Sequence, residues 1–549
     1  MTPQTYKKVP INEEEINWQD NKWHKTTTSE NLFDSAFDQF SVIISLGWPN
    51  CIERFANFLP GFVILLFYGQ LGPDNIAGAG LGFMFGNVTG LSIIVGFALG
   101  LSPLSSQAYG ASNYQRCGDL LQKQISMHLI MILPPIIIIW LNCESILLAL
   151  NQPPEISKLC GLFLFWRLPA LPFFCISEDI ISFLKSQRIF VPTMILMIIL
   201  CFFTIIFGGF LILPKPYGIG LGFIGGPIAL TCSNIIQTIY LIFKSKQLIM
   251  IPQTWPRWNY KIAFSHWGEL LNLSLPSALM MWGEWWAWET TVFLAGLLCS
   301  DDAILPQAQT QDDAFLGNTT TNYTLNMNNN GNNGSNIDVE NEESSCIHME
   351  VLTIISNTMM LAYYFHSGYS HASGSHIGNL LGLGDYKGAL MATRVCLMLV
   401  GMISLCIAIL LLAIRHEWGK LFSDDPKVHN MVAHAIVVVS GYLVADAIGP
   451  GALKNILIVL GEVHLPAVIT LGAFYFVGLP ISVYLTFGPP KWHNIYGIWI
   501  GLLIGVFVMI TGFSIILYKV DYAEKATSAR KRALEIEDRS SGTVVIEEN

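Results

Sequence analysis

Long apolar stretches recur along this chain of 549 residues and constrain its fold more than any other feature. A helix that crosses a bilayer needs about 20 mostly apolar residues, and Pro, Gly and charge clusters divide the chain into twelve stretches of this kind. They lie near residues 41–68, 75–100, 122–142, 160–182, 190–213, 222–243, 268–298, 350–372, 390–414, 432–458, 463–487 and 496–518. Because polar residues do not alternate with apolar ones, an outer-membrane barrel is disfavoured. The sequence predicts an all-α polytopic membrane protein with 12 transmembrane helices.

The composition favours the same class. Hydrophobic residues make up 52% of the chain and charged residues 12%, whereas soluble domains carry roughly 25% charged residues. The apolar content excludes a disordered chain, and a net charge of −10 argues against nucleic acid as a partner. A Walker A loop, a nucleophile elbow and a His/Cys metal cluster are all missing from the sequence. We therefore expect no enzyme, no cofactor, no metal site and no ATP-driven pump.

The basic residues indicate the orientation. The first 40 residues are polar and lack the apolar core of a cleavable signal peptide. If the N-terminus is cytoplasmic, most Lys and Arg residues lie on cytoplasmic loops and tails, as the positive-inside rule requires. We expect both termini in the cytoplasm. We also expect a monomer in the lipid bilayer of the plasma membrane or of a vacuolar or vesicular membrane.

An Asn-rich segment at about 300–348 has the character of an extracellular insertion. It contains no Lys or Arg, several acids, and three sequons at Asn318, Asn322 and Asn333. We expect glycosylation of at least one sequon, although Asn runs also produce such triplets by chance. Cys299 and Cys346 flank the segment, and a disulfide between them would close its base. The unbridged alternative for this pair remains open.

The two halves of the chain resemble each other. Pro49 of the first span matches Pro276 of the seventh at an offset of 227, and Gly110 after the second span matches Gly382 after the eighth at an offset of 272. The offset increases where the Asn-rich segment is inserted, so the pattern indicates a duplication into two pseudo-symmetric six-helix bundles. Duplicated bundles are a common plan of transporters, whose substrate site lies near the midplane.

This duplication predicts five regions. They are a cytoplasmic N-terminal tail at 1–40, an N-lobe with helices 1–6 at 41–245, a cytoplasmic linker at 246–267, a C-lobe with helices 7–12 at 268–518, and a cytoplasmic C-terminal tail at 519–549.

Few charged residues fall inside the predicted spans, where each one costs several kcal/mol and usually marks a pathway or a pair. Arg54 and Arg167 are the basic residues that we place within spans. The acidic residues are Glu53, Glu178, Asp179, Glu284, Glu289 and Asp446. Glu178 and Asp179 lie near the end of their span, where we expect a solvated edge.

Glu284 lies halfway along the apolar seventh span. A carboxyl group in an apolar environment keeps its proton more readily, so it can exchange that proton for a cationic ligand. A permanently neutral, hydrogen-bonded acid is the alternative. Glu289 is five residues further on and about 140° around the helix. Asp446 precedes Gly449 and Pro450 in the tenth span, and a second acid near Glu284 would couple their titrations.

Aromatic and polar residues complete the expected cavity. Trp285, Trp286 and Trp288 follow Glu284 and offer aromatic faces to a flat cation, although packing and interface anchoring are the commoner roles of Trp. The other expected cavity residues are Asn87, Asn50 and Glu53. His366, His371 and His376 recur at a spacing of five, which does not suit a metal site on a helix, so we expect polar packing for them.

These residues resemble the multidrug and toxin extrusion (MATE) family, and its eukaryotic branch in particular, from about residue 41 to 518. The matching motifs are Pro276-Ser277-Ala278, Glu284-Trp285-Trp286 with Glu289, Asn87-Val88-Thr89-Gly90, Gln107-Ala108-Tyr109-Gly110-Ala111, Gly378-Asn379 and Phe474-Tyr475-Phe476-Val477-Gly478-Leu479-Pro480. The sequence departs from the family at His376, where the family has Arg. It also lacks the first-helix Asp of bacterial members.

The resemblance implies a V-shaped MATE fold and the export of organic cations or other xenobiotics by alternating access, in exchange for H⁺. It assigns proton coupling and substrate binding to Glu284 and Asp446, with Glu289 as a second acid of the seventh helix. A Na⁺-coupled drug antiporter is one alternative. A lipid or oligosaccharide flippase of related fold is disfavoured because few basic residues lie within spans, and an embedded enzyme or receptor lacks a clustered catalytic set.

Overall fold

The computed structural model describes residues 32–249, 251–255, 257–316, 347–423, 425–488, 495–537 and 544–546. The predicted sequons Asn318, Asn322 and Asn333 lie outside these ranges, as does Cys346, the predicted disulfide partner of Cys299.

The first half of the chain folds into helices that fill the predicted spans one to six. In order, the elements are α2 (Leu32–Gly69), α3 (Pro73–Gly86), the π-helix η1 (Asn87–Leu91), α4 (Ser92–Ala98), α5 (Leu101–Gly110), α6 (Tyr114–Met127), η2 (His128–Ile132), α7 (Leu133–Leu141), α8 (Cys143–Ala149), α9 (Pro154–Arg167), η3 (Leu168–Ala170), α10 (Leu171–Ser186), α11 (Val191–Ile212), η4 (Gly222–Ile224), α12 (Gly225–Leu248), η5 (Pro252–Thr254) and α13 (Tyr260–Ala263).

The second half repeats the helical plan and ends in a helix outside the bundle. In order, the elements are α14 (Gly268–Leu316), α15 (Ile347–Leu383), α16 (Tyr386–Trp418), η6 (Gly419–Leu421), α17 (Pro426–Asp446), the π-helix η7 (Ala447–Leu453), α18 (Lys454–Val459), α19 (His464–Leu471), η8 (Gly472–Gly478), α20 (Leu479–Phe487), α21 (Tyr496–Lys519), α22 (Tyr522–Leu534), β1 (Glu535–Glu537) and β2 (Val544–Ile546). The two strands pair antiparallel.

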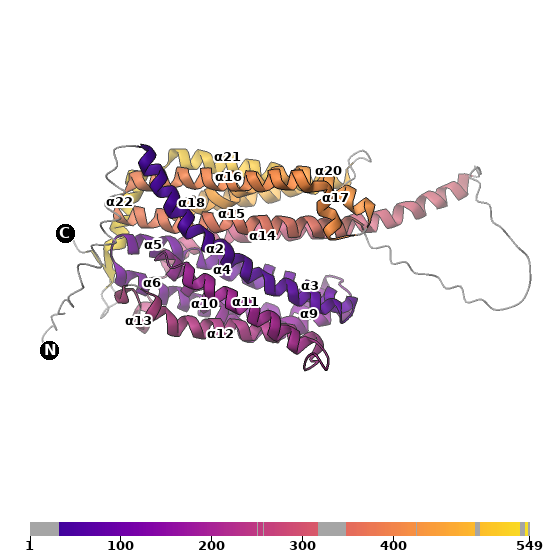
Figure 1. The fold of residues 1–549 in the computed structure, drawn as a ribbon, viewed down its shortest axis with the longest axis horizontal. Coiled ribbons are helices and arrows are strands. Elements are labelled where there is room, and N and C mark those ends of the chain that lie inside the picture. Colours follow the sequence, from indigo (N-terminus) through magenta and orange to yellow (C-terminus); the bar gives the residue numbers. More distant parts are fainter. Residues whose placement is uncertain are drawn as a thin grey trace, which may run out of the picture.

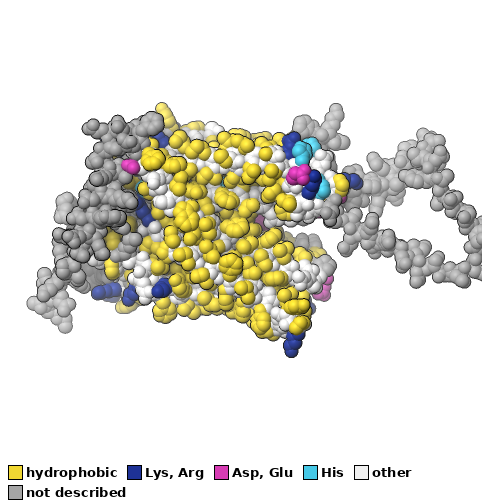
Figure 2. Space-filling view, viewed as in Figure 1, with side chains coloured by type: hydrophobic (Ala, Val, Ile, Leu, Met, Phe, Trp, Pro, Cys, Tyr) yellow, Lys and Arg dark blue, Asp and Glu magenta, His cyan; other side chains and the backbone are white. Residues whose placement is uncertain are grey.

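Ten helical segments among the described residues are long and apolar enough to cross a membrane, and they coincide with predicted spans one to six and nine to twelve. The helices α14 and α15 occupy the predicted seventh and eighth spans. Large apolar side chains on these helices face outward, including Phe202 and Ile206 of α11 and Ile409 of α16. They form a broad apolar band over the face in Figure 2, with charged groups toward its two ends. The chain is therefore an integral, multi-pass membrane protein.

The helices are arranged in two halves that lie one above the other in Figure 1, with the first half below and the second half above. One core surrounds Trp140, Phe163 and Phe183 in the first half, and another surrounds Tyr442 and Trp499 in the second. The helix α2 packs on α11 of its own half and crosses onto α15 of the other. At the end opposite to α22, the surface between the halves is hollowed (Figure 2).

Glycines bring the two halves into close contact along two seams. A Cβ at Gly96 would collide with Ala278, where α4 meets α14, and a Cβ at Gly368 would collide with Cys51, where α2 meets α15. The sequence offsets of 272 and 227 convert the first of these contacts into the second. The duplication predicted from the sequence therefore describes how the halves meet.

The end of the bundle that carries α22 (the α22 end) is closed by a contact with the same symmetry. A Cβ at Gly110 would collide with the carbonyl oxygen of Asn379, and a Cβ at Gly382 would collide with the carbonyl oxygen of Gln107. Both pairs are related by the offset of 272. The Gln107 amide also donates to the Val459 carbonyl at 2.9 Å. Only glycine permits this approach of α5 to α15, because any side chain would separate the helices.

The helix α22 lies across this closed end and contacts both halves. Asn113 of the first half donates to the Ala533 carbonyl at 2.7 Å. In the second half, the Tyr522 hydroxyl donates to Thr393 at 3.0 Å, and Lys525 pairs with Glu462 at 2.5 Å. Burial raises the pKa of Tyr522 to about 12, so its phenol remains a donor at neutral pH. The contacts of α22 thus stabilise the closure.

Candidate functional site

The candidate site is a buried charge cluster in the second half of the protein, with Glu284 of α14 at its centre. Glu284 is only 3% exposed, and its carboxylate forms an ion pair with the ammonium group of Lys454 at the start of α18. The Lys454 side chain is also buried. Because an isolated charge is costly inside a membrane, each of these groups stabilises the other.

Asp446 is the second acid of this cluster, and it is 2% exposed. Its Oδ1 accepts a long hydrogen bond of 3.4 Å from the Tyr442 hydroxyl, and its Oδ2 lies 3.7 Å from Nε2 of His366. Asp446 is also within electrostatic range of both Glu284 and Lys454. Two acids therefore share one lysine, and the sequence prediction that Glu284 and Asp446 lie near each other agrees with this arrangement.

The π-helix η7 positions the two members of the cluster that come from the tenth span. Asp446 ends α17 and Lys454 begins α18, with Gly449-Pro450-Gly451 between them. Pro450 has no N–H to donate and so disrupts the regular helical ladder. Gly451 lets this segment pack against His366 of α15, and its carbonyl accepts a 2.6 Å hydrogen bond from Ser370.

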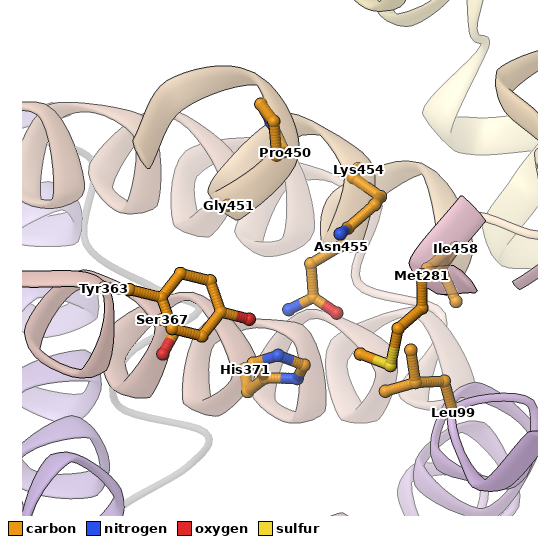
Figure 3. Close-up of a pocket in the computed structure, with 10 residues that line it drawn as sticks. All are labelled: Leu99, Met281, Tyr363, Ser367, His371, Pro450, Gly451, Lys454, Asn455 and Ile458. Carbon is orange, nitrogen blue, oxygen red and sulfur yellow. The ribbon is translucent and has the colours of Figure 1, made fainter. Parts of the chain in front are cut away.

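A small polar cavity lies beside the charge cluster (Figure 3). Its lining residues come from both halves: Leu99, Met281, Tyr363, Ser367, His371, Pro450, Gly451, Lys454, Asn455 and Ile458. In Figure 3, the Lys454 ammonium, the Asn455 amide and the Tyr363 hydroxyl point toward the space above His371. The free space corresponds to about one water molecule, so a larger ligand would require the halves to separate here.

The sequence analysis missed Lys454. It placed only Arg54 and Arg167 among the basic residues within spans, although Lys454 lies inside the predicted tenth span, 432–458. That placement was wrong because position 454 was assigned to the cytoplasmic side of the segment. The signal that identifies it is a lone Lys in the apolar run that follows Gly449-Pro450-Gly451.

The remaining seventh-helix residues separate into packing and exposed groups. The Trp288 ring packs edge-on against Tyr442 and Trp499, with centroids 5.8 and 5.6 Å away. Trp286 instead donates its indole N–H to the Val88 carbonyl in η1 at 3.1 Å. Trp285 and Glu289 are half-buried. Trp288 therefore serves the core of the second half, next to Tyr442, which contacts Asp446.

The other predicted cavity residues lie in the first half. Asn50 is fully buried and donates to the Gly368 carbonyl at 2.9 Å, so it joins α2 to α15. Glu53 pairs with Lys185 at 2.7 Å and accepts a hydrogen bond from the Thr193 hydroxyl. Asn87 is half-buried in η1. Asn50 and Glu53 thus form structural contacts in the part of the chain that the structure describes.

Asp179 does not lie at a solvated edge, and that expectation was wrong. Asp179 and His128 are both fully buried, with Oδ2 and Nδ1 2.8 Å apart. His128 was not singled out in the sequence, because its partner is 51 residues away on another helix. Glu178, the neighbour of Asp179, is half-buried. The first half therefore contains a buried acid–histidine pair of its own.

The three recurring histidines have different environments. His366 approaches Asp446, and His371 lines the cavity. His376 joins the halves, because its Nδ1 accepts from Arg188 at 2.8 Å and its Nε2 donates to Gln39 at 2.5 Å. The residues that the structure describes contain no group of three or more His, Cys, Asp or Glu side chains suited to a metal ion.

Comparisons with known proteins agree with this architecture. The sequence model of the MatE family matches residues 49–210 and 346–484. "Protein DETOXIFICATION 12" of Arabidopsis thaliana is 28% identical over 92% of this chain and 95% of that protein. "Multidrug and toxin extrusion protein 1" of Xenopus tropicalis is 27% identical over 90% of this chain and 76% of that protein.

A solved structure shares the fold. The crystal structure of the eukaryotic MATE transporter AtDTX14 superposes with a TM-score of 0.75 at 22% identity, covering 92% of this chain and all of that one. The family predicted from the sequence motifs is thereby confirmed. This chain belongs to the MatE family, whose members are membrane transporters rather than enzymes.

Proposed function

We propose that this protein exports organic cations by exchanging them for protons at Glu284. The observation that carries this proposal is the buried ion pair between Glu284 and Lys454, with Asp446 close by. A carboxylate in this position accepts one cation at a time: the lysine ammonium, a substrate ammonium or a proton. Competition for one acid couples the movement of substrate to that of protons.

Lys454 acts in this mechanism as an internal cation that holds the empty site. A cationic substrate displaces the ammonium group from Glu284, and Lys454 then turns toward the Asp446 carboxylate. Protonation of Glu284 removes the charge that binds the substrate, so the substrate leaves. When the proton dissociates on the opposite side of the membrane, Glu284 recovers its charge and pairs with Lys454 or with the next substrate.

The shape of the protein supports this proposal. The α22 end is closed by the Gly110 and Gly382 contacts, and the hollow between the halves opens at the other end (Figure 2). We place the α22 end in the cytoplasm, as the basic residues of the sequence predict. The conformation is then outward-facing, and rocking of the halves about the α4–α14 and α2–α15 seams would expose the site to the cytoplasm. The name of the Xenopus relative, which refers to multidrug and toxin extrusion, supports the same direction of transport.

The test is the transport of a fluorescent organic cation, the ethyl ester of rhodamine B, into vesicles that contain the purified protein. A pH gradient is imposed, and accumulation is expected to follow it. Glu284→Gln should abolish this dependence because glutamine has no exchangeable charge. Glu417→Gln is the matched control, since Glu417 is exposed and pairs only with Lys420. If Glu284→Gln transports with unchanged pH dependence, the proposal is wrong.

The same vesicles distinguish Na⁺ coupling. Without a pH gradient, a Na⁺ gradient is compared with an equal choline gradient. Proton coupling predicts no accumulation of the dye in either case. Accumulation that follows Na⁺ alone would replace the proton in this scheme by Na⁺.

A further inference from the structure

The guanidinium group of Arg54 is a cation near the centre of the molecule that the scheme above does not use. It is half-buried on α2, and its Nε atom is buried without a hydrogen-bond partner. Arg54 forms no hydrogen bond and no ion pair with the residues that the structure describes. A charge without a direct counter-charge in the membrane interior costs several kcal/mol, so its retention requires another explanation.

Neighbouring contacts place Arg54 on the face of α2 that meets α15. Asn50 and Cys51, one turn earlier, bond to the backbone carbonyls of Gly368 and Phe365. Phe58, one turn later, packs on Tyr364 with ring centroids 5.4 Å apart. Side chains spaced by four residues lie on one face of a helix, so Arg54 lies between these contacts, at the seam between the two halves.

Arg54 shares its surroundings on α15 with the charge cluster of the second half. It is within electrostatic range of Tyr363, His366 and His371. Tyr363 also interacts with Glu284 and Asp446. Two of these α15 residues, Tyr363 and His371, line the cavity in Figure 3. A positive group from the first half and a negative cluster from the second half therefore face common side chains.

The nearby acids do not neutralise Arg54 by direct contact. Glu53 is engaged by Lys185 and Thr193, and adjacent residues on a helix point in different directions. Glu178 of α10 is within electrostatic range of Arg54, but the stronger attraction on it comes from Lys185. The planar guanidinium group of Arg54 thus has donors left for a ligand, and it suits a carboxylate because it can donate two parallel hydrogen bonds.

We propose that Arg54 binds the anionic group of amphoteric substrates, so that the transporter accepts zwitterions whose cationic end faces Glu284. This inference rests on the proposed function, and it specifies the substrate class of the same site. A molecule that carries both a carboxylate and a cationic group would satisfy both walls. A pure cation would leave Arg54 without a counter-charge.

A matched pair of dyes tests the proposal. Rhodamine B is a zwitterion with a free carboxylate, and its ethyl ester is a pure cation of nearly equal size. Transport of both dyes is measured in vesicles, and the ratio of their kcat/KM values is compared between variants. Arg54→Gln is expected to lower the ratio of zwitterion to ester at least tenfold, since a charge-assisted hydrogen bond contributes roughly 1.5–3 kcal/mol. Arg54→Lys, which keeps the charge, should retain most of the ratio.

The outcomes separate this inference from the proposed function. If the wild-type protein fails to move the ester, the proposed function fails, whatever happens to the zwitterion. If the ester is moved and Arg54→Gln leaves the ratio unchanged, the role of Arg54 is overturned. An equal loss for both dyes also overturns it, because a merely structural residue would behave in that way. Elution of each variant as a single species in detergent confirms that the compared proteins are folded.

Discussion

Lys454 donates to the carboxylate of Glu284, so the acid at the middle of α14 is neutralised by a residue that lies 170 positions later in the chain. Both side chains are buried. This relationship makes the transport site electrically balanced when it is empty. It also means that a cationic substrate must compete with a cation that the protein itself supplies.

Removal of Lys454 should destabilise the protein more than removal of the whole pair. Lys454→Met leaves the Glu284 charge buried and uncompensated, which costs about 3–5 kcal/mol. The double variant Glu284→Gln with Lys454→Met should recover most of this loss. Thermal unfolding in detergent gives the comparison as a double-mutant cycle. Strictly additive effects of the two substitutions would show that the pair does not form.

The Lys454→Met variant should also respond to pH. A proton on Glu284 removes the uncompensated charge, so the stability deficit relative to wild type should be largest at high pH and shrink as the pH falls. The double variant, which has no acid at position 284, is the control and should show a deficit that does not vary. A deficit of Lys454→Met that grows on acidification would contradict this explanation.

Closure of the α22 end should depend on two glycines in equal measure. Gly110→Ala and Gly382→Ala each place a methyl group against a backbone carbonyl of the other half, and overpacking of this kind costs roughly 1–3 kcal/mol. Both should shift the protein toward the state in which this end is open. The distance between spin labels on α5 and α15 measures the shift. Gly401→Ala is the control, because a Cβ there meets open space, and it should leave the distance unchanged.

The two adjacent acids of α10 should differ sharply. Asp179→Ala breaks a fully buried pair with His128 and is expected to cost about 3–5 kcal/mol. Glu178→Ala removes a half-buried side chain and should change the free energy of unfolding by about 1 kcal/mol or less. Thermal unfolding of both variants decides between this arrangement and the solvated edge that the sequence suggested. Equal and small effects would restore the solvated edge.

The contact of Tyr522 with Thr393 should stabilise α22 across the neutral range. In an unfolded chain the Tyr phenol ionises near pH 10, whereas burial raises the pKa of Tyr522 to about 12. The stabilisation is therefore fully present below about pH 10 and is lost as the pH rises toward 12. Tyr522→Phe should cost roughly 0.5–1.5 kcal/mol between about pH 6 and pH 9, with no slope. Tyr518→Phe, at a side chain that is 92% exposed, should have no effect; a sloping cost for Tyr522→Phe would refute this interpretation.

The helices could be predicted because their signals are local. An apolar run of about 20 residues is visible in any window of the chain, and ten of the twelve predicted spans reappear as candidate spans among the described residues. The duplication was visible as well, since a contact that is repeated by pseudo-symmetry requires the same small residue twice. Gly110 and Gly382 are such a pair.

The partners of the buried charges could not be predicted in this way. Asp179 was placed in solvent because its position along the helix does not reveal His128 on a neighbouring helix. Lys454 was assigned to the cytoplasmic side because a lysine near the end of an apolar run usually reaches the membrane surface. Both errors concern which way a side chain points, and that depends on helices far away in the sequence.

The sequence alone thus determined the class of protein, the position of Glu284 within an apolar span and the doubled architecture, because length, hydropathy and spacing are properties of single segments. Only the tertiary structure decided which charges meet. Glu284 pairs with Lys454 because η7 turns the tenth span toward α14, and Arg54 lacks a direct counter-charge because Glu53 is held by Lys185. In a medium of low dielectric constant, such pairings determine which charges are available to a ligand.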